Sequence, residues 1–169
     1  MTTAPAEQPT ASHVPLEGWH RIFEPLHEEH DYVIDDIEGE LPTTLAGTMY
    51  RNGPGKWEQG GTALCHLLEG DGMISSFEFG SGRLRYRNRY VRTPAYKLGL
   101  GTGGMKIRTA GTMLPGGPDA NVGQEVARQA NTNVQLHAGR LLALYGGAQP
   151  WELAPDTLDT IGVCDLGGV

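Results

Sequence analysis

The chain has 169 residues, a formal charge of −7 and a hydrophobic content of 38%. Its length and composition suit one globular domain of ordinary size, and 25 glycines with 11 prolines favour short strands between tight turns. The acidic balance excludes a surface that follows nucleic-acid phosphates, because such surfaces need clustered lysine and arginine, so we expect no nucleic-acid partner.

The cysteines and the first residues indicate the compartment. Cys65 and Cys164 are too few for a disulfide framework, although one bond between them stays open. Residues 1–18 are poor in large apolar side chains, which predicts a disordered tail before a domain over residues 19–169. Neither a signal-like leader nor an apolar run of about 18 residues is present. We therefore expect a cytoplasmic protein.

The first half of the chain predicts extended segments and one clear hairpin. After a turn at residues 39–42, residues 45–50 read as a strand that runs into a loop at residues 52–55. Strict alternation then predicts strands over residues 73–79 and 84–91, joined through Gly80-Ser81-Gly82. The same alternation places four arginines on one face, which we interpret as solvated: Arg83, Arg85, Arg87 and Arg89.

A long glycine-rich stretch follows. Residues 94–129 have low periodicity and predict a loop, with one short helix near residues 121–128. Gly99-Leu100-Gly101-Thr102-Gly103-Gly104 matches the dinucleotide fingerprint G-x-G-x-x-G. The fingerprint needs a helix directly after it, and the glycines and prolines that follow prevent one, so we assign no nucleotide site.

The last part of the chain predicts a meander of four short strands. These cover residues 133–137, 140–145, 151–153 and 158–163, with turns at Ala138-Gly139 and Pro155-Asp156. A four-stranded antiparallel meander is one blade of a β-propeller, and blades recur at roughly 40 to 50 residues. The sequence therefore predicts an all-β fold. This length would hold about three or four blades of a propeller whose closure needs more chain, but no sharp internal repeat is present, so the partial propeller depends more on the family resemblance given below than on periodicity.

Histidine spacing gives no metal site. His27 and His30 are three residues apart, whereas a zincin helix needs two histidines four apart. Cys65 and His66 are neighbours, but adjacent residues of a strand point to opposite faces, and a nucleophile must converge with its base. From spacing alone, we assign neither metal ligands nor cofactor-binding residues.

Six blocks in a fixed order carry a family resemblance. They are Gly39 to Pro42, Leu45 to Pro54, His66 to Met73, Asn88 to Thr93, Ala130 to Thr132, and Pro155 to Thr160. Together they resemble the carotenoid cleavage oxygenases. The resemblance implies a seven-bladed β-propeller that holds a non-haem iron(II) ion on four histidines. With dioxygen, that iron splits a double bond of a carotenoid, apocarotenoid or stilbenoid into two carbonyl products.

The resemblance also implies roles for individual residues. None of the iron ligands would lie within this chain. Thr132 matches a threonine that crowds the vacant coordination position, and it is the one catalytic residue that we assign. Gly146 stands where the family usually places a glutamate that hydrogen-bonds a ligating histidine, and such a loss costs about 10- to 100-fold in affinity or activity. His66 would belong to the scaffold, and Gly70 and Gly72 would allow a turn with positive φ.

Several alternatives stay open. The leading hypothesis is the N-terminal part of a cleavage dioxygenase, which this chain alone would not complete. The rival is a truncated or degenerate non-catalytic β-module, and an isomerising relative is a third alternative. The resemblance places residues 94–129 near the mouth of the substrate tunnel, with peripheral membrane contact. Unpaired blade edges lead us to expect self-association of the isolated chain.

Overall fold

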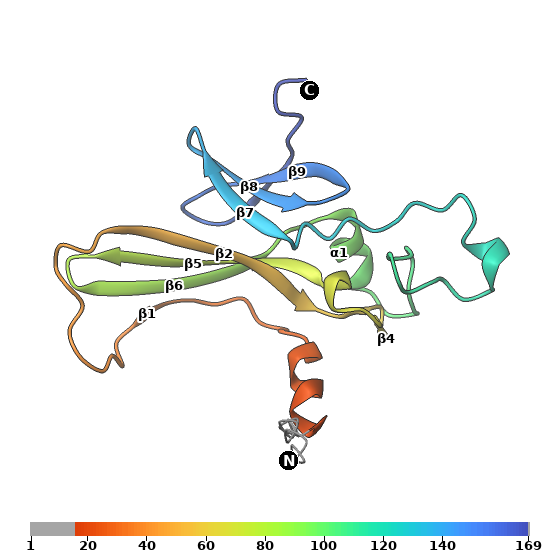
Figure 1. Ribbon diagram of the computed structural model, residues 1–169, viewed down its shortest axis with the longest axis horizontal. Helices are drawn as coiled ribbons and strands as arrows, with labels where there is room; N and C mark the ends of the chain where they lie inside the picture. Colours follow the sequence, from red (N-terminus) through yellow and green to blue (C-terminus); the bar gives the residue numbers. More distant parts are fainter. Residues whose placement is uncertain (1–15, 169) are drawn as a thin grey trace, which may run out of the picture.

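The computed structural model describes residues 16–168, in which two four-stranded antiparallel sheets lie face to face (Figure 1). The first sheet has the order β1-β6-β5-β2, the second the order β10-β9-β8-β7, and β3 and β4 form a small ribbon. Of the tail predicted for residues 1–18, residues 1–15 lie outside the described part. The strands are β1 (Asp31–Ile34), β2 (Gly47–Lys56), β3 (Glu58–Gln59), β4 (Thr62–Ala63), β5 (Asp71–Gly80), β6 (Arg83–Tyr90), β7 (Asn133–His137), β8 (Arg140–Tyr145), β9 (Ala148–Leu153) and β10 (Thr160–Val163).

The helical elements are short. They are η1 (Leu16–Phe23), η2 (Leu67–Glu69), α1 (Pro94–Gly99) and η3 (Pro118–Ala120). Within residues 16–168, none of them has the length and apolar character that crossing a bilayer requires. The all-β prediction is therefore confirmed, with antiparallel meanders in both sheets.

The predicted hairpin of the first sheet is confirmed, and the predicted loop beside it is wrong. β5 pairs with β6 from Met73 to Gly80, and the two strands are joined by Ser81-Gly82, both with positive φ, as a two-residue hairpin turn requires. Residues 52–55 belong to β2 and pair with β5 as far as Pro54. Because β2 is an edge strand, Pro54 interrupts no ladder on the outer side, and the register shifts between Pro54 and Lys56.

The predicted meander of the second sheet is confirmed. Ala138-Gly139 forms the first turn with positive φ at both residues, and β9 already begins at Ala148, so the next connection is short. The expectation of three or four blades is wrong, since residues 16–168 form two four-stranded sheets. The reason is that residues 94–129 form no sheet, which leaves less chain for strands than the average blade length assumes.

The stretch at residues 94–129 contains a helix at a different place from the predicted one. α1 begins at Pro94, and Thr93 caps it by accepting the Tyr96 N–H. No helix forms over residues 121–128, because Gly123 has a φ of 74° and the Ala127 N–H bonds to Arg108 O instead. The stretch is thus held by non-local contacts.

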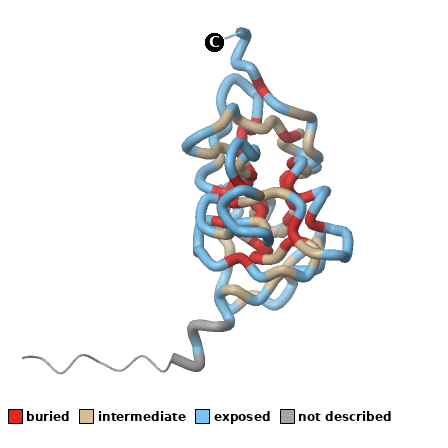
Figure 2. The backbone as a smooth tube through the Cα atoms, turned by 90° about the vertical axis from the view of Figure 1, so that its right-hand side faces the viewer, coloured by how far each residue is buried: buried red, intermediate tan, exposed pale blue. Residues whose placement is uncertain are grey.

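The core lies between the two sheets, where the buried positions gather (Figure 2). Ile74 from the first sheet packs with Leu141 and Leu153 from the second, and all three are fully buried. The arginine face shares this side, since Arg89 pairs with Ile74 across the ladder. Our interpretation of a solvated arginine face is therefore wrong in part. Farther from the core, that face lines a polar cavity of about 390 Å³ together with residues 155–157, which connect β9 with β10.

Two glycines of the His66 to Met73 block serve close approach instead of a turn. Gly72 lies in β5 and Gly70 is extended with a φ of −67°, so the predicted turn with positive φ is wrong. A Cβ atom at Gly72 would lie 2.3 Å from Ala130 O, and one at Gly70 would lie 2.8 Å from Pro54 Cβ. Backbone approach therefore explains why these positions lack a side chain.

We predict that Gly72→Ala destabilises the chain and that Gly53→Ala does not. The new methyl group at position 72 meets backbone atoms that cannot rotate away, which costs about 1–3 kcal/mol in the free energy of unfolding. At Gly53, a Cβ atom has nothing within 4 Å. Urea unfolding of both variants checks this. Equal stability of the two variants would contradict the close-approach argument.

Candidate functional site

Three of the six sequence blocks, those that contain Asn52, Gly72 and Ala130, meet at one seam between the sheets, formed by residues 129–133. We call this the seam segment. Gly72 N donates to Gln129 O at 2.9 Å, which joins the segment to β5. Asn52 Nδ2 donates to Ala130 O at 2.9 Å and to Asn133 O at 2.6 Å, which joins it to β2. Blocks separated by as many as 81 residues in sequence thus become neighbours.

A second amide fixes the seam segment from within. Asn131 is buried, and its Nδ2 donates to Leu68 O at 2.8 Å and to Gly70 O at 2.7 Å. Ala130 has a φ of 51°, a conformation that favours glycine. Four side-chain hydrogen bonds to backbone carbonyls therefore hold a strained backbone in one conformation.

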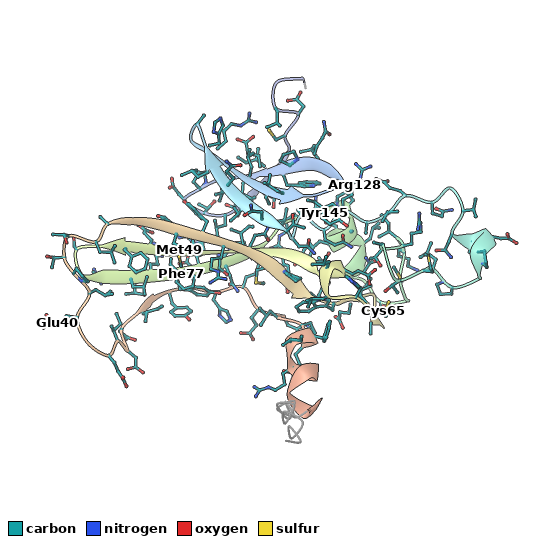
Figure 3. The ribbon with its side chains drawn as sticks, viewed as in Figure 1. Glu40, Met49, Cys65, Phe77, Arg128 and Tyr145 are labelled. Atoms are coloured by element: carbon teal, nitrogen blue, oxygen red, sulfur yellow. The ribbon has the colours of Figure 1, made fainter. Side chains whose placement is uncertain are left out.

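Thr132 lies at the exposed start of β7. Its Oγ1 donates to Leu144 O at 2.9 Å, and its N–H donates to the same oxygen at 3.2 Å. Leu144 directly precedes Tyr145-Gly146, which Figure 3 locates through the label on Tyr145. The structure thus brings the two positions singled out by the resemblance, Thr132 and Gly146, to the same end of the second sheet.

Gly146 has room for a longer side chain. It lies in the exposed turn between β8 and β9, its φ is not positive, and a Cβ atom there would have nothing within 4 Å. Gly147 is equally open. Sterics therefore do not explain why Gly146 lacks the glutamate that the resemblance implies.

His66 has a structural role, as the resemblance implied. Its Nδ1 accepts the Leu68 N–H at 3.2 Å, and its own N–H donates to Glu69 Oε2 at 3.0 Å, which forms a capping box around η2. Cys65 and Cys164 are both free thiols, the first exposed and the second buried, so the bond left open by sequence is not formed.

The described residues do not provide a metal centre. Between residues 16 and 168, no three side chains of His, Cys, Asp or Glu lie close enough to share an ion. Around Thr132, the polar neighbours are the Leu144 carbonyl and the Asn52 amide group on Asn133 O. An iron site with histidine ligands does not fit this set of groups.

A buried ion pair beside the seam could not be predicted from residue types alone. Lys56 Nζ lies 3.5 Å from Asp71 Oδ2, and both side chains are almost fully buried. The Lys56 ammonium also lies 5.2 Å from the centre of the Tyr96 ring. Burial raises the pKa of Asp71 to about 6, and Lys56 offsets only part of this effect. The residues next to Lys56 do not indicate that Asp71 is its partner, because only the pairing of β2 with β5 brings the two together.

Comparison with known proteins identifies related sequences. The family model described as retinal pigment epithelial membrane protein matches residues 23–169. The chain is 38% identical to the apocarotenoid-15,15'-oxygenase of Synechocystis over 100% of its own length and 35% of that protein. It is 36% identical to a carotenoid cleavage oxygenase of Mycobacterium tuberculosis over 99% of its length and 30% of that protein. It is 32% identical to lignostilbene-alpha,beta-dioxygenase isozyme III of Sphingomonas paucimobilis over 93% of its length and 32% of that protein.

The fold agrees with a solved relative. Cobalt-substituted Synechocystis apocarotenoid oxygenase superposes with a TM-score of 0.85 at 40% identity, over 90% of this chain and 33% of that one. The two sheets correspond to part of that protein's seven-bladed propeller. The chain spans about a third of the length of the curated relatives that it matches.

We predict that Asp71 makes the chain less stable as pH rises. The folded pKa of Asp71, about 6, lies above its ordinary value of 3.8, so between these two pH values the folded state binds more protons than the unfolded state. The stabilising contribution is therefore complete below about pH 4 and is lost as pH rises through about 6, which amounts to about 3 kcal/mol. Relative to the wild type, Asp71→Asn should gain about that much stability between pH 4 and 7 in urea unfolding.

Asp31→Asn is the matched control. The Arg85 and Arg87 guanidinium groups lower the pKa of Asp31, with the Arg85 hydrogen bond as the largest cause, so its contribution grows with pH. The difference between this variant and the wild type should therefore move in the opposite direction. Parallel pH profiles for the two variants would refute the assignment of opposite shifts.

Proposed function

Because the chain belongs to the carotenoid oxygenase family, we propose that it is the N-terminal part of a non-haem iron(II) dioxygenase. The substrate class is a carotenoid, apocarotenoid or stilbenoid, whose double bond is cleaved with dioxygen to two carbonyl products. The observation that carries the proposal is the seam. There three of the six family blocks meet, and Thr132 lies at an exposed sheet end.

In this proposal, the iron belongs to the part of the relatives that the chain does not cover. The described residues do not offer the set of iron ligands. The chain would therefore contribute structural support and part of the lining of the site. The Thr132 side chain would crowd the vacant coordination position and so limit what can bind the iron beside dioxygen. Asn52 and Asn131 keep the backbone under Thr132 in place.

A second candidate is a degenerate, non-catalytic β-module, and Gly146 favours it. A glutamate that orients a ligating histidine raises the basicity of the ligand, and an exposed glycine cannot do this. An isomerising relative would use the same structural support for a different reaction. Activity of the complete site decides among these candidates.

The long loop supplies the proposed contact with an apolar substrate or the membrane that holds it. Leu98, Leu100, Met113 and Val122 are each about half exposed or more, with Val122 at 77%. Met113 and Val122 line a cavity of about 530 Å³ together with Pro118. Exposed apolar side chains around a concave surface suit a peripheral contact in a cytoplasmic protein.

The test is a chimera in which this chain replaces the matching third of Synechocystis apocarotenoid oxygenase. We expect the chimera to bind iron and to cleave an apocarotenoid, and the isolated chain to do neither. Stoichiometric iron and cleavage by the isolated chain would show that the site is complete without further residues. A folded chimera that binds iron without cleaving would favour the non-catalytic module.

Within the chimera, Gly146→Glu should raise iron affinity or turnover by about 10- to 100-fold, because it restores the carboxylate that orients a ligand. Gly147→Glu is the control, since it adds the same charge at the next position with the same space. Metal titration and the rate of product formation measure both variants. An equal gain from the two would point to charge alone.

We also propose that the isolated chain self-associates through the outer face of the first sheet. Met49, Phe77, Tyr86 and Tyr32 form one row across its four strands, and Figure 3 labels the first two. Tyr32 and Met49 are about half exposed. The sedimentation coefficient should rise with concentration, and Met49→Lys should lower it. A monomer at every concentration would contradict this proposal.

A further inference from the structure

Glu69 has an environment that the family resemblance does not explain. It is 2% exposed at the end of η2, and within the described residues no lysine or arginine bridges it. Its carboxylate instead accepts from groups on residues 109–112, which lie 40 or more residues away. When a distant loop supplies the hydrogen bonds that a buried carboxylate needs, those bonds hold the loop in place.

The hydrogen bonds to Glu69 are numerous and short. Thr109 Oγ1 donates to Oε1 at 2.6 Å, the Thr112 N–H donates to Oε1 at 2.8 Å, and Thr112 Oγ1 donates to Oε2 at 2.8 Å. The Gly111 N–H donates to Oε1 as well. Burial alone would raise the pKa of Glu69, but the bonds from Thr109, Thr112 and Gly111 outweigh it and hold this pKa below its ordinary value.

The loop held by Glu69 is a closed excursion over residues 108–127. Its two ends meet where Arg108 bridges Val126 and the Ala127 N–H donates to Arg108 O at 2.8 Å. Between these ends the excursion extends beyond the sheets, with η3 in its outer part (Figure 1). It contains the cavity of about 530 Å³, and Asn121 holds the wall by three bonds to Leu114 and Gly117.

η2 is itself anchored on the opposite side. Asn131 Nδ2 donates to Leu68 O and Gly70 O, the carbonyls on either side of Glu69. Cys65, labelled in Figure 3, marks the same junction, where its N–H donates to Thr112 Oγ1 at 2.9 Å. The excursion is thus tied through η2 to the seam segment.

We propose that Glu69 is a positioning residue that fixes the excursion, and with it the apolar cavity, against the first sheet. Without the carboxylate, the donors of Thr109, Gly111 and Thr112 lose their acceptor and the excursion opens locally while the sheets stay folded. The connection to a polyene substrate or a membrane rests on the proposed function. The positioning role itself does not.

The test is hydrogen exchange of backbone amides in Glu69→Gln. Glutamine keeps one oxygen acceptor for the donors at Oε1, but it loses the charge, and its NH₂ group faces the His66 N–H that Oε2 accepts. The bonds from Gly111 and Thr112 are therefore weaker, and these two amides should exchange about 10- to 100-fold faster than in the wild type. The acceleration should extend along residues 110–125, whereas amides of β5 and β8 should be unchanged. Glu125→Gln is the matched control, because it removes the same charge from an exposed carboxylate of the same excursion.

Two further variants keep the test decisive if Glu69→Gln does not fold. Glu69→Asp retains the charge, one methylene shorter, and should restore much of the protection at Gly111 and Thr112. Thr112→Val removes one donor from the loop side and should accelerate the same amides to a smaller extent. Unchanged protection at Gly111 in these variants, or equal acceleration throughout both sheets, would overturn the proposal. Because exchange requires neither iron nor substrate, an inactive chimera would leave this result unaffected.

Discussion

The close backbone approach of Gly72 to the seam segment is the contact on which the rest of the structure depends. Gly72 N donates to Gln129 O, and no side chain would fit between Gly72 and Ala130 O. Ile74, two residues farther along β5, packs against Leu141 of the second sheet. A wider spacing at Gly72 would therefore separate the apolar surfaces that form the core. The same spacing determines where Thr132 lies relative to the first sheet.

Much of the strand structure could be predicted from the sequence because alternation is a local signal. The hairpin around Ser81-Gly82 and the final meander have period two and turn residues that allow positive φ. The loop predicted at residues 52–55 was wrong because proline usually ends a strand. Pro54 lies on an edge strand, where its missing N–H leaves no gap in the ladder. α1 had a readable start in Thr93-Pro94, but its six residues are too few for helical periodicity.

In the candidate site, too, only the residues with a sequence signal could be predicted. Thr132 and Gly146 could be singled out because ordered sequence blocks carry a resemblance. Their roles stay predictions, and the structure brings both residues to one sheet end. Asn52, Lys56 and Glu69 gave no such signal. Polar residues are mostly exposed, and what makes these three different is a partner 15 to 81 residues away. Only strand pairing and loop closure bring such partners together, so residue type alone could not reveal them.

These non-local contacts meet at η2. The Glu69 carboxylate accepts from the excursion, and the carbonyls on either side of it accept from Asn131 in the seam segment. Release of either contact would leave buried polar groups without partners, which costs more than an exposed contact would. The apolar cavity of the excursion and the backbone beneath Thr132 are therefore held in one frame.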